Sequence, residues 1–259
     1  MDIKKEYERW LANATADADV AAELKTLDDA KVEDAFYRDL AFGTGGLRGV
    51  IGAGTNRMNI YTVAKASQGL ADYLKKNFAE PSVAIGYDSR IKSDVFAKVA
   101  AGVFAANGVK VNIWPVLMPV PTVSFATRYL HTSAGVMVTA SHNPGKYNGY
   151  KVYGADGCQI TDHVAQAITD EIYAVGYTDA RILSEAEARR ARKWLDVEDS
   201  VHRSFAQACL FCRPDPTVCS SVHVVYTPLH GTGLLPVREV LSRMQGVTVT
   251  EVTAQCEPD

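Results

Sequence analysis

The fold is decided by residues 135–154, which read Gly-Val-Met-Val-Thr-Ala-Ser-His-Asn-Pro-Gly-Lys-Tyr-Asn-Gly-Tyr-Lys-Val-Tyr-Gly. The apolar run at residues 135–138 predicts a buried strand, and the Asn-Pro-Gly of residues 143–145 is a strong turn signal. A second strand is expected over residues 150–153. The segment therefore predicts a strand that breaks at a tight loop, where the hydroxyl of Ser141 is held rigid and exposed.

Strands and helices alternate on both sides of this segment. Further strands are expected at residues 82–87, 110–114, 221–227 and 247–252. Helices are expected at residues 3–13, 18–40, 63–78, 94–107, 162–175, 201–208 and 234–244, and a short one ends near Tyr129. This alternation predicts an α/β fold built from crossover units around a mostly parallel sheet. Residues 1–190 are expected to form one domain and residues 191–259 part of a second, with the polar stretch 176–200 connecting them.

The composition excludes several classes of protein. Of the 259 residues, 47% are hydrophobic and 22% are charged, as in soluble globular proteins. A net charge of -3 argues against nucleic acid as the main partner, and Lys98 and Lys110 interrupt the most apolar region, so no membrane span is expected. The charged N-terminus lacks the apolar stretch of a signal peptide, which makes the cytoplasm the expected location.

Five cysteines do not suggest a disulfide framework, because their number is odd and their spacing uneven. Cys209 and Cys212 form a C-x-x-C motif, with Cys219 nearby. The preceding residues 201–208 have the pattern of an amphipathic helix, so apolar packing is favoured over metal or redox chemistry.

The loop after residue 138 has the charge pattern of a phosphoryl-transfer site. Lys146 and Lys151 follow Ser141, and the next acidic residue is Asp156. Adjacent residues on extended backbone point to opposite sides, so Ser141 and His142 are not expected to pair as nucleophile and base. No Gly-x-Ser-x-Gly elbow surrounds Ser141, which also disfavours a serine hydrolase.

Two further segments suit phosphate binding. Residues 43–49 form a glycine-dense loop in which glycines flank Arg48, and exposed amides with a guanidinium match phosphate oxygens. No Walker motif is present, and the absence of a preceding apolar strand disfavours a dinucleotide fingerprint. Asp88 and Arg90 follow the strand at residues 82–87, at the end where α/β sheets place ligand-binding loops.

These motifs together resemble the α-D-phosphohexomutases. Thr-Ala-Ser-His-Asn-Pro, followed by Asn-Gly-Tyr-Lys, is similar to their phosphoserine loop, and Phe-Gly-Thr-x-Gly-Leu-Arg-Gly to their opening signature. Residues 51–59 are similar to the phosphoglucomutase and phosphopentomutase branch. The resemblance implies a three-layer domain whose mixed, mostly parallel sheet is flanked by helices. It also implies a phosphoglucomutase, an intramolecular phosphotransferase that interconverts glucose 1-phosphate and glucose 6-phosphate through a phosphoserine and a bisphosphorylated sugar.

The resemblance also assigns roles to residues. Ser141 would carry the phosphoryl group and Lys151 would shuttle the hydroxyl proton, while Arg48 and His142 line the phosphoserine site. The expected substrate- and phosphate-binding residues are Thr44, Arg90, Asn143, Lys146 and His230. An Asp88–Arg90 pair that merely holds the loop is the alternative for Arg90.

The expected cofactors are Mg²⁺, bound by an oxygen of the Ser141 phosphate, and glucose 1,6-bisphosphate as activator; a hexose phosphate is the expected substrate. The family's Asp-x-Asp-x-Asp-Arg metal loop does not occur in the sequence, so an N-terminal fragment covering the first of four domains and part of the second is expected, with negligible turnover. Phosphomannomutase, phosphopentomutase and a non-catalytic sugar-phosphate binding module remain alternatives.

Overall fold

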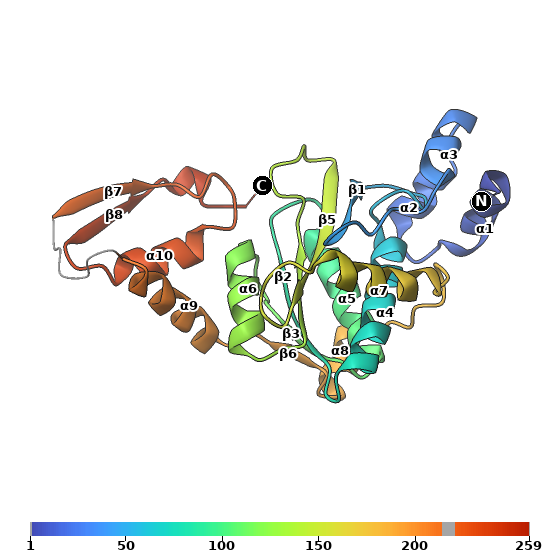
Figure 1. Cartoon of the computed structure of the whole chain (residues 1–259). Helices are drawn as coiled ribbons and strands as arrows, with labels where there is room; N and C mark the ends of the chain where they lie inside the picture. The colour runs from blue at the N-terminus through green and yellow to red at the C-terminus, as the bar shows by residue number, and fades with distance from the viewer. Residues whose placement is uncertain (1, 214–220, 259) are drawn as a thin grey trace.

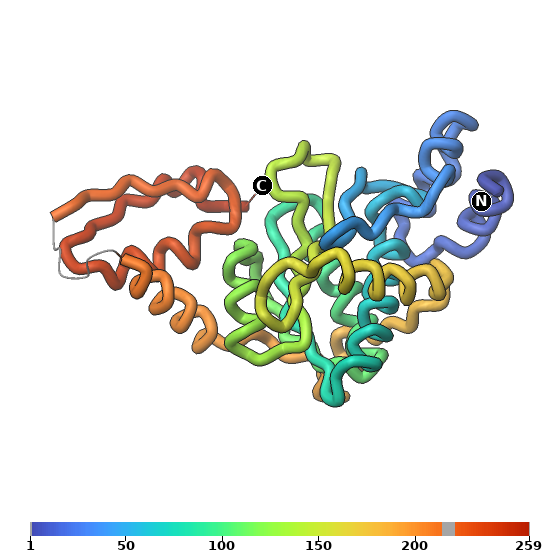
Figure 2. The backbone as a smooth tube through the Cα atoms, viewed as in Figure 1, coloured from blue at the N-terminus to red at the C-terminus, as the bar shows by residue number. Residues whose placement is uncertain are grey.

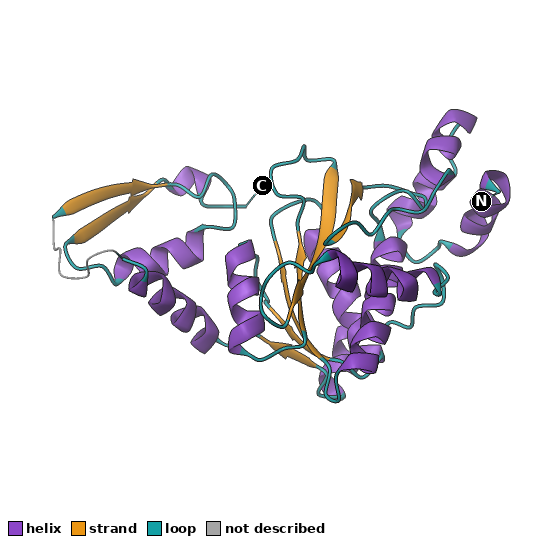
Figure 3. Ribbon diagram, in the orientation of Figure 1, coloured by secondary structure: helices purple, strands orange, loops and turns teal. Residues whose placement is uncertain are grey.

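A six-stranded sheet forms the centre of the molecule (Figures 1 and 3). The computed structural model describes residues 2–213 and 221–258. The strand order is β1-β5-β4-β2-β3-β6. Their bounds are β1 Gly46–Val50, β2 Ser82–Tyr87, β3 Lys110–Ile113, β4 Ala134–Val138, β5 Tyr147–Gly154 and β6 Trp194–Asp196.

The sheet is mixed because one of its strands runs against its neighbours. β5 pairs antiparallel with both β4 and β1, while β2, β3, β4 and β6 pair in parallel. The connection from β4 to β5 is a short loop around residues 143–145, and a short loop joins antiparallel strands, whereas parallel strands need a crossover. The predicted α/β class with a mixed, mostly parallel sheet is confirmed.

Helices cover both faces of this sheet. α6 packs on β2 and β4 from one side, and α5 packs on β2, β3 and β4 from the other, where α4 packs on α5 and α7 packs on α4 (Figure 1). The bounds of these helices are α4 Ile60–Asn77, α5 Ser93–Ala106, α6 Val120–Tyr129 and α7 Asp162–Tyr173. The sheet residues between the layers, such as Ile85 and Val136, are fully buried, which accounts for their apolar runs.

The N-terminal segment differs from the single helix expected over residues 18–40. After α1 (Ile3–Asn13) the chain forms two helices, α2 (Ala18–Leu24) and α3 (Asp29–Phe36). Asp28 starts α3, because its carboxylate accepts a hydrogen bond from the backbone N–H of Lys31 at 2.9 Å. Such a capping side chain satisfies the free amides of a new helix, so it interrupts a continuous one.

The stretch 176–200 was expected to connect the domains, but part of it belongs to the sheet. After α8 (Glu185–Arg190), β6 pairs in parallel with β3, with Val111 opposite Trp194. The sheet therefore extends past residue 190, the expected boundary. Trp194 is buried in the main core, which gives this three-residue strand its anchor.

A second, smaller unit follows and lies at the far end of the molecule from the N-terminus (Figure 2). It contains a two-stranded parallel sheet, β7 (Val222–Tyr226) with β8 (Val247–Glu251). α9 (Asp199–Phe211) and α10 (Leu234–Ser242) pack against each other beside it. Among the described residues, no helix combines the length and the apolar character needed to cross a bilayer.

Candidate functional site

Ser141 stands in the loop that leaves β4 at its carboxyl end. Its backbone is left-handed, with φ 56°. The Ser141 Oγ lies 3.3 Å from Nδ1 of His142. The expectation that these two side chains point apart is therefore wrong, because it assumed an extended backbone, whereas the backbone of Ser141 is left-handed.

Arg90 lies beneath this loop and donates hydrogen bonds to its carbonyl oxygens. The guanidinium reaches the carbonyl of Ser141 at 2.9 Å and that of Tyr147 at 2.9 Å, and it also binds the carbonyl of Asn143. The carboxylate of Asp88 lies 3.7 Å away. These contacts support the loop-holding alternative for Arg90; direct phosphate binding by it stays a prediction.

The glycine-dense segment at residues 43–49 is only partly a loop, because its second half belongs to an edge strand of the sheet. Residues 46–50 form β1, in which Arg48 lies opposite Gly149 and Gly46 opposite Lys151. Arg48 and Lys151 are thus diagonal neighbours on one face of the sheet, since alternate residues of a strand share a face. Gly46 has φ 138°, and a Cβ there would lie 1.8 Å from the Tyr150 carbonyl oxygen, so this close pairing requires glycine.

A cavity of about 500 Å³ brings most of the predicted site together. Its walls include Thr44, Arg48, Ser141, His142, Asn143 and Lys151, which come from three separate segments of the chain. Within the described residues, the lining includes two cationic side chains and no carboxylate. Such a cavity attracts anions to the Ser141 hydroxyl.

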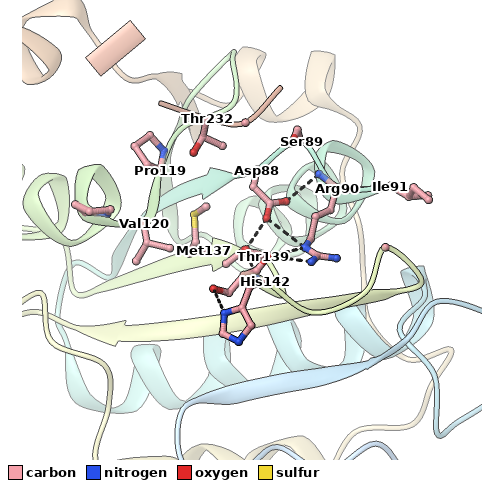
Figure 4. A pocket seen from close by; sticks show the side chains of 14 residues that line it. Asp88, Ser89, Arg90, Ile91, Pro119, Val120, Met137, Thr139, His142 and Thr232 are labelled. Carbon is pink, nitrogen blue, oxygen red and sulfur yellow. Dashed lines mark hydrogen bonds and ion pairs between the residues drawn. The ribbon is translucent and has the colours of Figure 1, made fainter. Parts of the chain in front are cut away.

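A second cavity, of about 760 Å³, also has Ser141 in its lining (Figure 4). Asp88, Arg90 and Thr139 line it from the first unit, and Thr232 from the second. Ser141, His142 and Thr139 are common to both cavities. The serine therefore stands at the border between a cationic cavity and the junction of the two units.

Two predicted binding residues lie elsewhere among the described residues. The Lys146 ammonium is 5.7 Å from the ring centroid of Tyr147, and Lys146 lines neither cavity. The Nδ1 of His230 donates to the Glu257 carbonyl oxygen at 2.8 Å, while its neighbours Gly231 and Thr232 reach the larger cavity. Their roles stay predictions.

Sequence reasoning missed Thr139, Thr232 and Gln159 as parts of the site. Gln159 lines the cationic cavity and donates to the Gly45 carbonyl at 3.4 Å. Thr139 lay within the quoted loop, two residues before the serine, where a hydroxyl often binds a backbone amide. That position was the available signal for it; Gln159 and Thr232 depend on tertiary placement.

A metal ion needs several ligating side chains that lie close together. Among the described residues, no group of three or more His, Cys, Asp or Glu side chains could hold one. Asp88, which lines the larger cavity, already accepts hydrogen bonds at both carboxylate oxygens. The described residues by themselves therefore provide no cluster of protein ligands for the Mg²⁺ expected from the sequence.

The C-x-x-C motif lies on α9. Partial burial, with the nearby Cys212, raises the pKa of the Cys209 thiol, which favours an unreactive thiol. Cys219, the third cysteine of the group, lies outside the described residues. Cys209 is half-buried and Cys212 is exposed, so the packing role of the motif stays a prediction.

Comparison with known proteins gives the following relationships. Residues 39–178 match the model of the family described as phosphoglucomutase/phosphomannomutase, alpha/beta/alpha domain I. A phosphoglucomutase of Staphylococcus haemolyticus is 38% identical over 227 residues, which cover 88% of this chain and 41% of the relative. A phosphoglucomutase of Staphylococcus aureus is 35% identical, covering 97% of this chain and 45% of the relative. The chain thus spans less than half the length of these relatives.

A solved structure shows the same arrangement. A crystal structure assigned as a phosphomannomutase from Thermus thermophilus superposes with a TM-score of 0.67 at 28% identity. The match covers 86% of this chain and 47% of that one. The family-model match and this superposition agree on the fold of the first unit.

Proposed function

This chain belongs to the phosphoglucomutase/phosphomannomutase family, and from that premise we propose that Ser141 accepts and returns a phosphoryl group of a hexose phosphate. The supporting observation is the cavity in which Ser141 meets Arg48, Lys151 and Thr44. Transfer of a phosphoryl group depends mainly on positioning and on neutralising its charge. A nucleophilic hydroxyl against a cationic wall meets both requirements.

The reaction proposed is that of a phosphoglucomutase. Phosphorylated Ser141 gives its phosphoryl group to the free hydroxyl of glucose 1-phosphate or glucose 6-phosphate; the bond from phosphorus to the serine oxygen breaks as the bond to the sugar oxygen forms. Lys151 takes the proton of that hydroxyl through its neutral amine and becomes the ammonium, and the released serine oxygen takes up a proton to become the free hydroxyl. The bisphosphorylated sugar turns round, and its other phosphoryl group returns to the serine oxygen.

The remaining site residues have supporting roles in this proposal. Arg48 and Thr44 bind the phosphoryl oxygens, because a guanidinium and a hydroxyl both donate hydrogen bonds to such oxygens. Asn143 and His142 line the same cavity. Mg²⁺ and glucose 1,6-bisphosphate are the proposed cofactor and activator. When bound, Mg²⁺ would neutralise charge on the phosphate, with Ser141's phosphate as its ligand from the described residues.

Phosphomannomutase activity is the second candidate, because the superposed Thermus thermophilus structure carries that assignment. A phosphopentomutase and a module that binds sugar phosphates without transfer are also left open by the sequence. Each of these candidate functions would use the same cationic cavity. They differ in whether Ser141 takes up a phosphoryl group and in which sugar phosphate is accepted.

The test is the intact mass of the chain after incubation with glucose 1,6-bisphosphate and Mg²⁺. One added phosphoryl group is expected on the parent and on Ser89→Ala, a matched control in the neighbouring cavity. Ser141→Ala is expected to gain none. A phosphoryl group on Ser141→Ala would overturn the assignment of the nucleophile, and a folded parent that binds the sugar phosphate without gaining mass would support the binding module instead.

A further inference from the structure

The backbone of Ser141 adopts a conformation that a residue with a side chain rarely takes. At φ 56°, its Cβ is crowded by the following carbonyl, so the surroundings must hold it there. Two groups of contacts do so, one on the amide that precedes the Ser141 Cα and one on the carbonyl that follows it.

The amide side is held by Thr139. The Ser141 N–H donates to the Thr139 Oγ1 at 2.8 Å, and the Thr139 hydroxyl donates to Oδ2 of Asp88. A threonine hydroxyl has a single proton. Because Asp88 accepts that proton, the Thr139 oxygen faces the Ser141 amide as an acceptor.

Asp88 is itself held in place by hydrogen bonds to its other carboxylate oxygen. Its Oδ1 accepts the Ser93 hydroxyl at 2.7 Å and the Arg90 backbone N–H at 3.1 Å. The Ser93 oxygen in turn accepts the Asn148 amide at 2.9 Å, and both Ser93 and Asn148 are fully buried. The chain of hydrogen bonds thus runs from the buried start of β5 to the serine.

The carbonyl side is held by Arg90. Its Nε and Nη2 donate to the Ser141 carbonyl oxygen at 3.2 and 2.9 Å. The same guanidinium is drawn beside Asp88 and Thr139 in Figure 4. Both peptide groups of Ser141 are therefore tied to the segment that follows β2.

We propose that Asp88 and Thr139 are positioning residues for phosphoryl transfer at Ser141, acting by orienting its amide and so keeping the left-handed backbone that presents the hydroxyl at the cationic cavity. The inference rests on the proposed function. A displacement of about 1 Å at a reacting group costs roughly 100-fold in rate. A loop anchored through the half-buried carboxylate of Asp88 resists such a displacement when a phosphoryl group arrives or leaves.

The test compares Thr139→Val, which removes the hydroxyl but keeps the shape, with Thr139→Ser, which keeps the hydroxyl. Thr127→Val is the matched control, since the Thr127 hydroxyl is also buried and hydrogen-bonded but lies on α6. Hydrogen exchange of the Ser141 amide, the rate of phosphorylation by glucose 1,6-bisphosphate and the free energy of unfolding are measured for each.

In Thr139→Val, exchange of the Ser141 amide is expected to be about tenfold faster or more, and phosphorylation about 10- to 100-fold slower. Thr139→Ser and Thr127→Val are expected to match the parent in both. Asp88→Asn, which cannot accept both hydroxyls as the carboxylate does, is expected to resemble Thr139→Val.

The outcomes separate this inference from the proposed function. Unchanged Ser141 exchange in folded Thr139→Val and Asp88→Asn would overturn the inference, as would equal losses in Thr139→Ser. A parent that takes no phosphoryl group, with exchange that responds as expected, would overturn the function while the positioning of Ser141 stands.

Discussion

The central six-stranded sheet and the β7–β8 sheet differ in how far their residues are removed from water. All five residues of β4 and five of the six in β2 are buried, whereas every residue of β7 and β8 is exposed or half-buried. Burial of apolar surface is the main favourable contribution to folding. The first unit therefore contributes most of the folding free energy. The second unit, which lines part of the larger cavity through Thr232, contributes much less.

The largest expected contrast comes from removing apolar volume in each sheet. Ile85→Ala in β2 should lower the free energy of unfolding by about 2–5 kcal/mol, because Ile85 is fully buried and its loss leaves a cavity. Val225→Ala in β7 should change it by less than about 0.5 kcal/mol, since Val225 is 68% exposed. Urea unfolding measures both, and similar losses would contradict the contrast.

A smaller contrast is expected in how the free energy of unfolding depends on pH in alkaline solution. Burial raises the pKa of the Tyr150 phenol well above its ordinary value, so the folded protein keeps it neutral while the unfolded chain ionises near pH 10. Stability is therefore full below pH 10 and falls above it, by about 1.4 kcal/mol for each pH unit from this residue. Tyr150→Phe should flatten that decline at the cost of the hydrogen bond that Ser67 donates at 3.1 Å.

Tyr226→Phe is the matched control for this measurement. Partial burial also raises the pKa of Tyr226 in β7, but that side chain is far less enclosed, so its replacement should alter the alkaline slope less. Urea unfolding between pH 8 and pH 11 gives the slopes. An equal slope in the parent and Tyr150→Phe would show that Tyr150 ionises without unfolding.

The smallest contrast concerns backbone conformation. Ser141→Gly should be more stable than Ser141→Ala by about 0.5–1 kcal/mol, because glycine adopts positive φ without strain. At Ser204 in α9 the order should reverse by about 1 kcal/mol, since glycine is the poorer helix former. Thermal unfolding of the four variants decides, and a Ser141→Ala variant that equals Ser141→Gly would mean that the left-handed backbone is unstrained.

Much of the fold could be predicted from the sequence because apolar periodicity reports burial. The strand expected at residues 82–87 is β2, and the helix expected at residues 94–107 is α5 to within one residue at each end. β6 escaped prediction because it has three residues and pairs through a backbone that periodicity does not encode. The break before Asp28 was missed because one capping hydrogen bond decided it.

Less of the candidate site than of the fold could be predicted from the sequence. Motifs indicated which residues carry the chemistry, and β1–β5 pairing explains why Arg48 and Lys151 meet. The conformation of Ser141 depends on Asp88, 53 residues earlier in the chain, and Thr232 reaches the cavity through the placement of the second unit. Such long-range determinants leave no local pattern to be read.

The β7–β8 sheet has a consequence for the behaviour of the protein at high concentration. Within the described residues each strand has one partner, which leaves an open row of backbone donors and acceptors along its outer side. Val222 and Val225 are exposed on β7. An apolar strand with a free edge is a template for another chain, so self-association of this protein should begin at the second unit.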